Sequence, residues 1–211
     1  MLLDHFGRTY PVSTELGQGY FDETPKAQLT ADLERVLQGP LTRNGLDLEK
    51  LRQGKFFTRE GKRRVPGTNS YAAPRELLRY LLLLEQGKLV DAFSSREIKR
   101  LLYNTQRIIR YASSPALSNA AVYFKSGSYY RCKEDPEFVC KKYHGNVFNW
   151  MNSVAIVEAP AESRKLYYLV VVMSNVLRKN SAVEHQTFAT RLHRLIERYH
   201  AAEQPASAAA K

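Results

Sequence analysis

The sequence lacks a long hydrophobic run. No stretch of about eighteen consecutive apolar residues occurs in it, so we predict no transmembrane segment. The first residues, MLLDHFGR, have neither the basic start nor the apolar core of a signal peptide, and no export signal is predicted in this chain. Hydrophobic residues make up 44% and charged residues 25% of the chain, which is typical of a folded globular protein.

Acidic residues are scarce relative to basic ones. The chain has 21 Asp and Glu against 32 Lys and Arg, which gives a formal net charge of +11. Such a charge would suit a polyanionic partner such as nucleic acid or a cell envelope. The only tight basic cluster, however, is Gly-Lys-Arg-Arg at 61–64, between turn signals. We therefore expect a generally basic surface, and nucleic-acid binding is kept only as a minor alternative.

Cysteine is nearly absent, and the two residues present are close together. Cys132 and Cys140 are eight positions apart across a polar, turn-rich segment, a spacing that would close a small disulfide loop in an oxidising compartment. This interpretation conflicts with the missing export signal. His144 adds one zinc-type ligand, but a structural zinc site needs a fourth ligand and a recognisable spacing. We predict a disulfide, no metal and no other cofactor.

Helical patterns occupy part of the first half of the chain. In an otherwise irregular first third, a short helical pattern at 33–37 should end at Gly39 and Pro40. The run 54–74 has no periodicity and is expected to be a long loop. Loops of that length in compact domains are often functional.

Two stronger helical patterns follow this loop. Pro74 suits the first residue of a helix that is apolar over much of its circumference and ends at Gly87. Ser94 and Glu97 form a capping-box pattern that opens a second helix, whose apolar spacing continues as far as Ile109.

From about residue 116 the pattern changes to strands. Segments 121–130, 153–158 and 166–173 are rich in Val, Ile and Tyr, and a short polar connection that suits a hairpin joins the last two. Ser181 and Glu184 form another capping box, before an amphipathic final helix. The predicted fold class is α+β, with helices, a three-stranded antiparallel meander and a C-terminal helix that covers one face.

The domain organisation follows from this order of elements. We predict a single domain over 1–202, helical to about 115, with the sheet and final helix from about 116. A disordered tail is predicted at 203–211.

The first predicted strand, AVYFKSGSYY, is interrupted by a lysine and a glycine. Glycine weakens a strand, and the usual compensation is a bulge or the close approach of a backbone or ligand. With the meander and final helix behind it, Lys125-Ser126-Gly127 resembles the third motif, Lys-Thr-Gly, of the β-lactamase and penicillin-binding-protein family of serine hydrolases. The run VPGTNSYAAP at 65–74 is similar to the end of the omega loop of class A β-lactamases. The resemblance covers 65–200 well and the first 60 residues loosely.

The resemblance implies a role for each residue of the motif. Lys125 would attract the substrate carboxylate and steady the ionised nucleophile, and Ser126 would donate its hydroxyl to that carboxylate. Gly127 would let the substrate lie against the strand, and the backbone N–H of Ser128 would be one of two oxyanion donors.

Two of the family's motifs are missing. No serine is followed three positions later by lysine, so the nucleophile motif Ser-x-x-Lys is absent, and so is Ser-x-Asn. We expect that the chain starts inside a longer protein and is inactive alone. Glu60 is the only carboxylate near the position of the deacylating glutamate, at a shorter spacing, and a solvated loop residue is the favoured interpretation.

The resemblance predicts the C-terminal part of a serine hydrolase that acts on β-lactams or peptidoglycan-like amides through an acyl-enzyme. The alternative is a non-catalytic module that binds peptidoglycan or a partner chain on the same scaffold. The missing N-terminal segment would itself be a partner. A periplasmic or secreted location is expected if the full-length protein carries an export signal. The aromatic residues are expected mainly to pack, with lining of a substrate groove as the second interpretation: Tyr129, Tyr130, Tyr143, Phe148 and Trp150.

Overall fold

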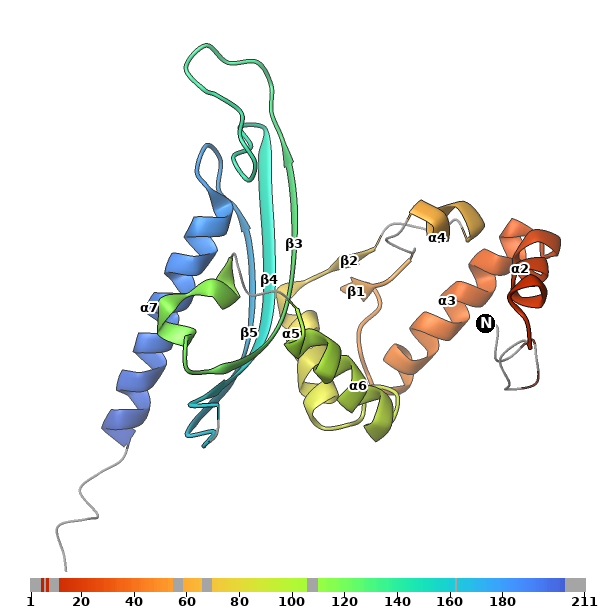
Figure 1. Ribbon diagram of the computed structural model, residues 1–211, viewed down its shortest axis with the longest axis horizontal. Coiled ribbons are helices and arrows are strands. Elements are labelled where there is room, and N and C mark those ends of the chain that lie inside the picture. The colour runs from red at the N-terminus through yellow and green to blue at the C-terminus, as the bar shows by residue number, and fades with distance from the viewer. Residues whose placement is uncertain are drawn as a thin grey trace, which may run out of the picture. The chain divides into compact units, whose positions relative to one another are not determined.

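The computed structural model describes residues 5, 7, 12–54, 59–65, 70–105, 110–161 and 163–203 (Figure 1). Its contacts form two compact units, Met1–Asp91 and Ala92–Lys211. The predicted tail lies outside the described residues from 204 onward. Within the described residues, no helix combines the length and the apolarity that crossing a bilayer requires.

The first unit is mainly helical, with one small two-stranded antiparallel sheet formed by β1 and β2. Its elements are α2 (Thr14–Glu23), α3 (Lys26–Arg43), β1 (Leu51–Arg52), α4 (Arg59–Arg64), β2 (Tyr71–Ala72) and α5 (Pro74–Glu85). Leu29 and Leu33 of α3 pack with Tyr20 and Val65 in a small buried cluster. The prediction of an irregular first third was therefore wrong, because burial of these apolar side chains stabilises helices that the short local pattern did not reveal.

Helix α3 also continues through the two residues that were expected to end it. Pro40 lies inside the helix, which ends only at Arg43. Leu41 is buried and holds the last turn against the unit. The Asn44 side chain then donates hydrogen bonds to the carbonyl oxygens of Pro40, at 2.9 Å, and Leu89, at 3.0 Å. Tertiary contacts at the helix end thus outweigh the one helical hydrogen bond that proline removes.

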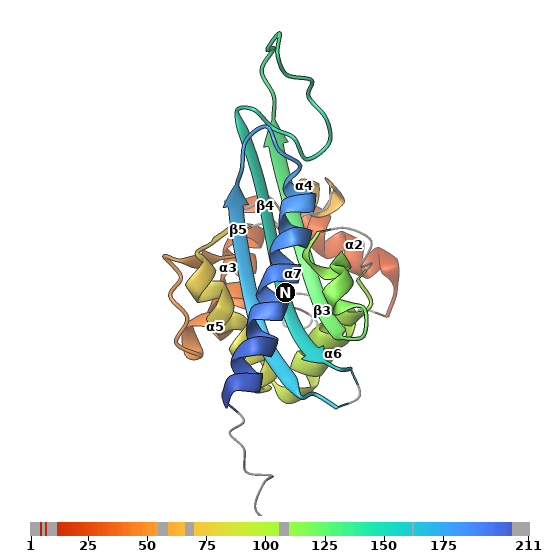
Figure 2. The same ribbon diagram turned by 90° about the vertical axis from the view of Figure 1, so that its left-hand side faces the viewer.

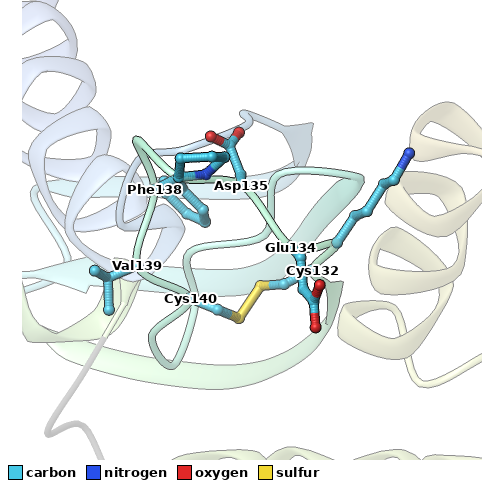
Figure 3. Close-up of a pocket in the computed structure, with 8 residues that line it drawn as sticks. Cys132, Glu134, Asp135, Phe138, Val139 and Cys140 are labelled. Carbon is cyan, nitrogen blue, oxygen red and sulfur yellow. A yellow bond between two sulfur atoms is a disulfide. The ribbon is translucent and has the colours of Figure 1, made fainter.

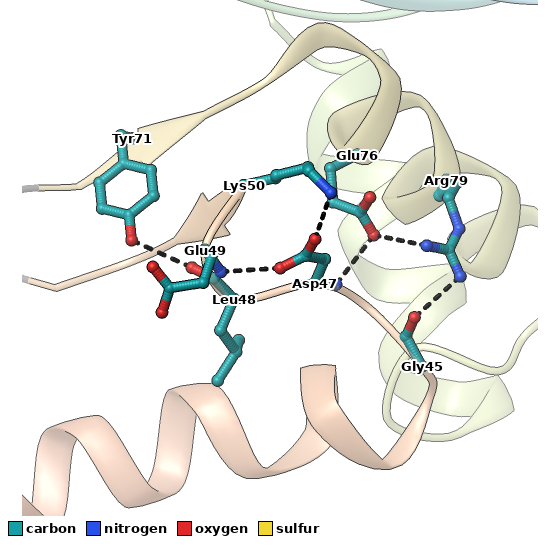
Figure 4. A network of polar contacts seen from close by, with 8 residues as sticks. All are labelled: Gly45, Asp47, Leu48, Glu49, Lys50, Tyr71, Glu76 and Arg79. Carbon is teal, nitrogen blue, oxygen red and sulfur yellow. Dashed lines mark hydrogen bonds and ion pairs between the residues drawn. The ribbon is translucent and has the colours of Figure 1, made fainter.

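A buried carboxylate connects α5 to the turn before β1 (Figure 4). Glu76, in the first turn of α5, accepts hydrogen bonds from the Asp47 amide at 3.0 Å and from the Arg79 guanidinium at 2.8 Å. Arg79 in turn donates to the Gly45 carbonyl oxygen at 2.8 Å. The helix predicted to run from Pro74 to Gly87 is confirmed, and Gly87 ends it with a φ of +68°, which favours glycine.

The second unit contains a three-stranded antiparallel sheet of order β3-β4-β5, as predicted (Figures 1 and 2). Its elements are α6 (Ala92–Tyr103), two short 3₁₀ turns η1 (Tyr111–Ser113) and η2 (Pro115–Leu117), β3 (Ala121–Arg131), β4 (Phe148–Ala159), β5 (Leu166–Asn175) and α7 (Ser181–Glu203). Figure 2 shows α7 lying along one face of the sheet. The core between them includes Val122, Phe124, Val157 and Ala189.

Two helix starts differ from the capping-box predictions. Helix α6 begins at Ala92, so Ser94 lies inside it, and residues 106–109 of the predicted helix lie outside the described residues. In α7 the capping side chain is Asn180, whose Oδ1 accepts from the amides of Ala182 at 3.1 Å and Val183 at 3.3 Å. The hydroxyl of Ser181 is instead used for a tertiary contact, because it donates to the Tyr143 carbonyl oxygen at 3.2 Å.

We predict that Asn180→Ala lowers the free energy of unfolding by about 1 kcal/mol, because two amides of the first turn of α7 lose their acceptor. Urea denaturation followed by circular dichroism measures the change. Thr187→Ala, at an exposed position inside α7, is the control and should change stability by less than about 0.5 kcal/mol. Equal effects of the two substitutions would contradict the assignment of Asn180 as the cap.

Candidate active site wall

The Lys-Ser-Gly motif lies on β3, which is an outer strand of the sheet. Among the described strands β3 pairs only with β4, so its other edge has no strand partner. The pairing runs without interruption from Ala121↔Glu158 to Arg131↔Phe148, so there is no bulge at Gly127. A Cβ added at Gly127 would meet no atom within 4 Å. The glycine therefore leaves open space beside the strand.

The strand alternation places the motif's side chains on two faces. Ser126 and Ser128 share a face with Phe124, which is buried in the core below α7. Lys125 and Gly127 lie on the opposite face. The ammonium group of Lys125 is exposed and donates to the carbonyl oxygen of Ser126 at 2.6 Å.

Arg110, which the sequence analysis did not identify, completes this part of the structure. Its guanidinium donates hydrogen bonds to the hydroxyl of Ser126 and, at 3.1 Å, to that of Ser128. A third hydrogen bond reaches the Tyr143 hydroxyl at 3.3 Å, and the guanidinium lies 5.2 Å from the centre of the Tyr143 ring. Arg110 thus joins the segment before η1 to the edge of β3 and to the loop between β3 and β4.

The backbone of Arg110 adopts an unusual conformation. Its φ is 73° and its ψ is −152°, a region that side chains with a Cβ rarely occupy and that costs of order 1–3 kcal/mol. Strain of this kind clusters at functional sites, where the surrounding contacts hold it in place. Here the three hydrogen bonds of the guanidinium are such contacts.

The charges around the Lys-Ser-Gly motif favour the binding of an anion. Among the described residues, neither Lys125 nor Arg110 forms an ion pair with a carboxylate, whereas Arg178, for example, pairs with Asp135 at 2.6 Å. Burial raises the pKa of Tyr143, but the hydrogen bond from Arg110 and the positive charges of Arg110 and Lys142 outweigh it, so the pKa is lowered. Arg110 at the Ser126 hydroxyl and Lys125 at the Ser126 carbonyl oxygen are therefore two cations that suit a carboxylate ligand.

A buried polar cluster lies between α7 and the sheet. His185 of α7 bridges two strands: its Nδ1 is 2.9 Å from the Ser153 hydroxyl and its Nε2 is 2.8 Å from the Ser174 hydroxyl. Burial, together with the positive charge of Arg110, lowers the pKa of His185 to about 4. Ser153 is only 1% exposed, so this serine and histidine pair supports the sheet and is not accessible to a substrate.

The depressed pKa of His185 makes stability depend on pH. The unfolded chain binds a proton at His185 below about pH 6.5, whereas the folded chain binds it only near pH 4, so the free energy of unfolding falls as the pH drops between these values. The difference corresponds to ~3 kcal/mol, fully present above pH 6.5. Urea unfolding at pH 7 and pH 5 measures it.

His185→Gln is the control for this pH dependence, because the amide can still bridge but does not titrate. His193, whose pKa is lowered by burial against the opposing charge of Glu197, titrates in both proteins and cancels in the comparison. If the variant lost as much stability between pH 7 and pH 5 as the unmodified chain, the role assigned to His185 would be wrong.

The loop between β3 and β4 contains the two cysteines (Figure 3). Cys132 and Cys140 are joined by a disulfide, with their Cα atoms 6.0 Å apart. The loop surrounds an open hollow of about 780 Å³. Arg178 anchors it through Asp135 and through the face of Phe138, whose ring centre is 5.7 Å from the guanidinium carbon. Among the described residues, no group of three or more His, Cys, Asp or Glu side chains is arranged as a metal site.

Glu60 lies in the first unit, in the first turn of α4. Its carboxylate accepts hydrogen bonds from Arg63 and then from Arg64, both at 2.7 Å, and these lower its pKa to about 2. A carboxylate held so firmly in its ionised form is a weak proton acceptor near neutral pH, which argues against a role as general base.

Comparison with known proteins supports the fold. No protein-family model matches the sequence, and no curated protein matches it. Among solved structures, the chain is similar to a β-lactamase from Chitinophaga pinensis DSM 2588, with a TM-score of 0.53 and 18% sequence identity over 81% of this chain. The match spans 55% of that β-lactamase chain. The chain therefore has a β-lactamase-like fold, and it matches little more than half the length of that protein.

Proposed function

We propose that this chain forms the substrate-binding wall of a serine hydrolase of the β-lactamase and penicillin-binding-protein type. The observation that carries the proposal is a pair of cations at Ser126 on an outer strand. Arg110 donates to the Ser126 hydroxyl, and Lys125, on the other face of the sheet, donates to the Ser126 carbonyl oxygen. Neither cation has a carboxylate partner among the described residues. In a β-lactamase-like fold, this is where the Lys-Thr-Gly motif is expected.

The proposed wall consists of Arg110 and the four residues 125–128, and each of them has a distinct role. Lys125 and Arg110 attract the carboxylate of a β-lactam or of a peptidoglycan-like peptide, and Ser126 donates a hydrogen bond to it. Gly127 leaves room for the substrate to lie against β3. The other edge of β3 has no partner among the described strands, so it can also hydrogen-bond an acyl amide. The Ser128 backbone N–H stabilises the oxyanion that forms when the carbonyl is attacked.

The nucleophile of the proposed reaction is not in these 211 residues, because Ser-x-x-Lys is absent from them. In the complete enzyme, the hydroxyl of such a serine attacks the carbonyl carbon, expels the amide nitrogen and forms an acyl-enzyme that water then hydrolyses. The wall alone supplies binding and oxyanion stabilisation, so we propose that the chain binds substrate without being acylated. The Cys132–Cys140 disulfide supports a periplasmic or secreted location.

The absence of the nucleophile motif also favours a second candidate, a non-catalytic module that uses the same wall to bind peptidoglycan or a partner chain. The two candidates differ in whether an added segment that carries Ser-x-x-Lys restores acylation. Mixing the chain with such a segment and a tagged penicillin, and looking for a covalent adduct by mass, separates them.

The proposed wall predicts that Lys125→Ala and Arg110→Ala each weaken the binding of benzylpenicillin to the 211-residue chain by about 10- to 100-fold, because each removes a hydrogen bond between charged groups. Isothermal titration calorimetry measures the affinity, and intact-mass analysis is expected to show no covalent adduct.

Lys165→Ala is the matched control, since it removes one exposed positive charge from the connection between β4 and β5. It should leave the affinity unchanged. An equal loss of affinity in Lys165→Ala and Lys125→Ala would show that only net charge matters and would refute the wall. Acylation of the unmodified chain would refute its proposed inactivity.

A further inference from the structure

Helix α7 carries a row of arginines on its outer side, which points away from the sheet (Figure 2). Arg191, Arg194 and Arg198 follow one another at spacings of three and four residues, so they line one side of the helix over about 10 Å. All three side chains are exposed, and none of the three guanidinium groups has a hydrogen-bond or ion-pair partner among the described residues. Like charges at these spacings repel one another, and a bound anion relieves the repulsion.

A row of exposed apolar side chains runs beside the arginines. Phe188, Leu195 and Tyr199 are 43%, 55% and 61% exposed, and their spacings of seven and four residues place them on one side of α7 over about 17 Å. Arg191 comes three residues after Phe188 and four before Leu195, so the two rows adjoin. We name the two rows together the α7 outer face: Phe188, Arg191, Arg194, Leu195, Arg198 and Tyr199.

The arginines also line a shallow depression of the surface. This open hollow of about 430 Å³ is lined by Arg191, Arg194, Arg198 and one carboxylate, Glu197. The Glu197 carboxylate lies 3.6 Å from the Nε2 of the buried His193. Three positive charges thus face a single negative one. Guanidinium groups match the oxygen atoms of phosphate well, so phosphate groups are the anions that suit the hollow.

The opposite side of α7 fixes the helix in place. Ala189 and Leu192 pack in the core against the sheet, so α7 presents its outer face without refolding. The other acidic residues of the helix are Glu184 in its first turn and Glu203 at its last position, both outside the two rows. A helix that combines a basic row with exposed aromatic and aliphatic side chains has the composition of helices that lie in the interface of a membrane.

We propose that the α7 outer face docks this protein on the surface of an anionic phospholipid bilayer. The arginines contact the lipid phosphates, and the apolar row enters the boundary between headgroups and acyl chains. An acidic protein could neutralise the arginines, but it would also need a groove that matches the convex helix. A bilayer offers phosphate and an apolar layer at every point, so it satisfies both rows at once. This inference does not depend on the proposed wall.

Cosedimentation of the 211-residue chain with vesicles tests the docking. Vesicles of equimolar phosphatidylglycerol and phosphatidylcholine are compared with vesicles of phosphatidylcholine alone. We expect binding to the anionic vesicles to be at least about tenfold tighter and to weaken as salt is added.

The double variant Arg191→Gln, Arg194→Gln should weaken binding to the anionic vesicles by about 30-fold, because each arginine near the membrane contributes about fivefold. The matched control is Lys133→Gln, Lys141→Gln, which removes the same charge from exposed positions of the loop between β3 and β4. It should weaken binding by less than about threefold. Circular dichroism checks that both variants fold.

A second measurement tests whether the apolar row enters the lipid. Leu195→Trp places a fluorophore in the row, and brominated phosphatidylcholine in the vesicles should quench its emission. Trp150 is the only tryptophan of the unmodified chain and provides the control. It pairs with Tyr129, on the sheet face opposite to Phe124 and α7, so its emission should not be quenched.

Each contrary result would overturn the proposal. Equal binding to both kinds of vesicle would exclude docking on anionic lipid, and equal losses in the two double variants would show that only net charge matters. Quenching of Trp150 as strong as that of the introduced tryptophan would place another face in the lipid. Binding that requires the arginines but leaves the introduced tryptophan unquenched would exclude insertion and favour an acidic protein as the partner.

Discussion

The pairing of β3 with β4 is the constraint on which the rest of the second unit depends. Side chains alternate along a strand, so a shift of the register by one residue would move every side chain of β3 to the other face. Phe124 would leave the core below α7, and Lys125 would enter it. The burial of Val122 and Phe124 therefore determines that Ser126 meets Arg110 and that Gly127 and Tyr129 face the other way. The proposed site is therefore positioned by apolar residues that have no role in the proposed chemistry.

The start of α7 also positions the loop between β3 and β4. The amide of Ser181 donates to the Tyr143 carbonyl oxygen at 3.0 Å, and the Tyr143 hydroxyl accepts from Arg110. Gly145 follows closely, and a Cβ there would come within 1.9 Å of the Phe148 carbonyl oxygen, so the turn requires glycine. The part of the long loop that precedes β4 is thus held by backbone contacts. Its tyrosine is the third partner that keeps the Arg110 guanidinium beside the two serines.

The sequence predicts the periodic parts of this structure well and the irregular parts poorly. The three strands and α7 are confirmed because alternation and helical spacing are local properties of the chain. The motif at 125–127 is visible as a pattern, whereas Arg110 is not: it approaches Ser126 through a backbone conformation with a φ of 73°, which no composition or spacing indicates. The continuation of α3 through Pro40 and the capping of α7 by Asn180 depend on tertiary contacts, which a local pattern does not contain.

The proposed site is distinguished by cations that have neutral partners, and the net charge of the chain does not locate it. A surplus of eleven positive charges could be spread anywhere over the surface and says little about function. Many of the basic side chains are paired: Arg63 and Arg64 share Glu60, and Lys99 and Arg164 both contact the buried carboxylate of Glu158 at 2.9 Å. Arg110 instead meets two hydroxyls and a phenol, and Lys125 meets a carbonyl oxygen. Neutral partners orient these two cations without cancelling their charge. Under the proposed function, the positive field that remains at the outer edge of β3 is available to the carboxylate of a ligand.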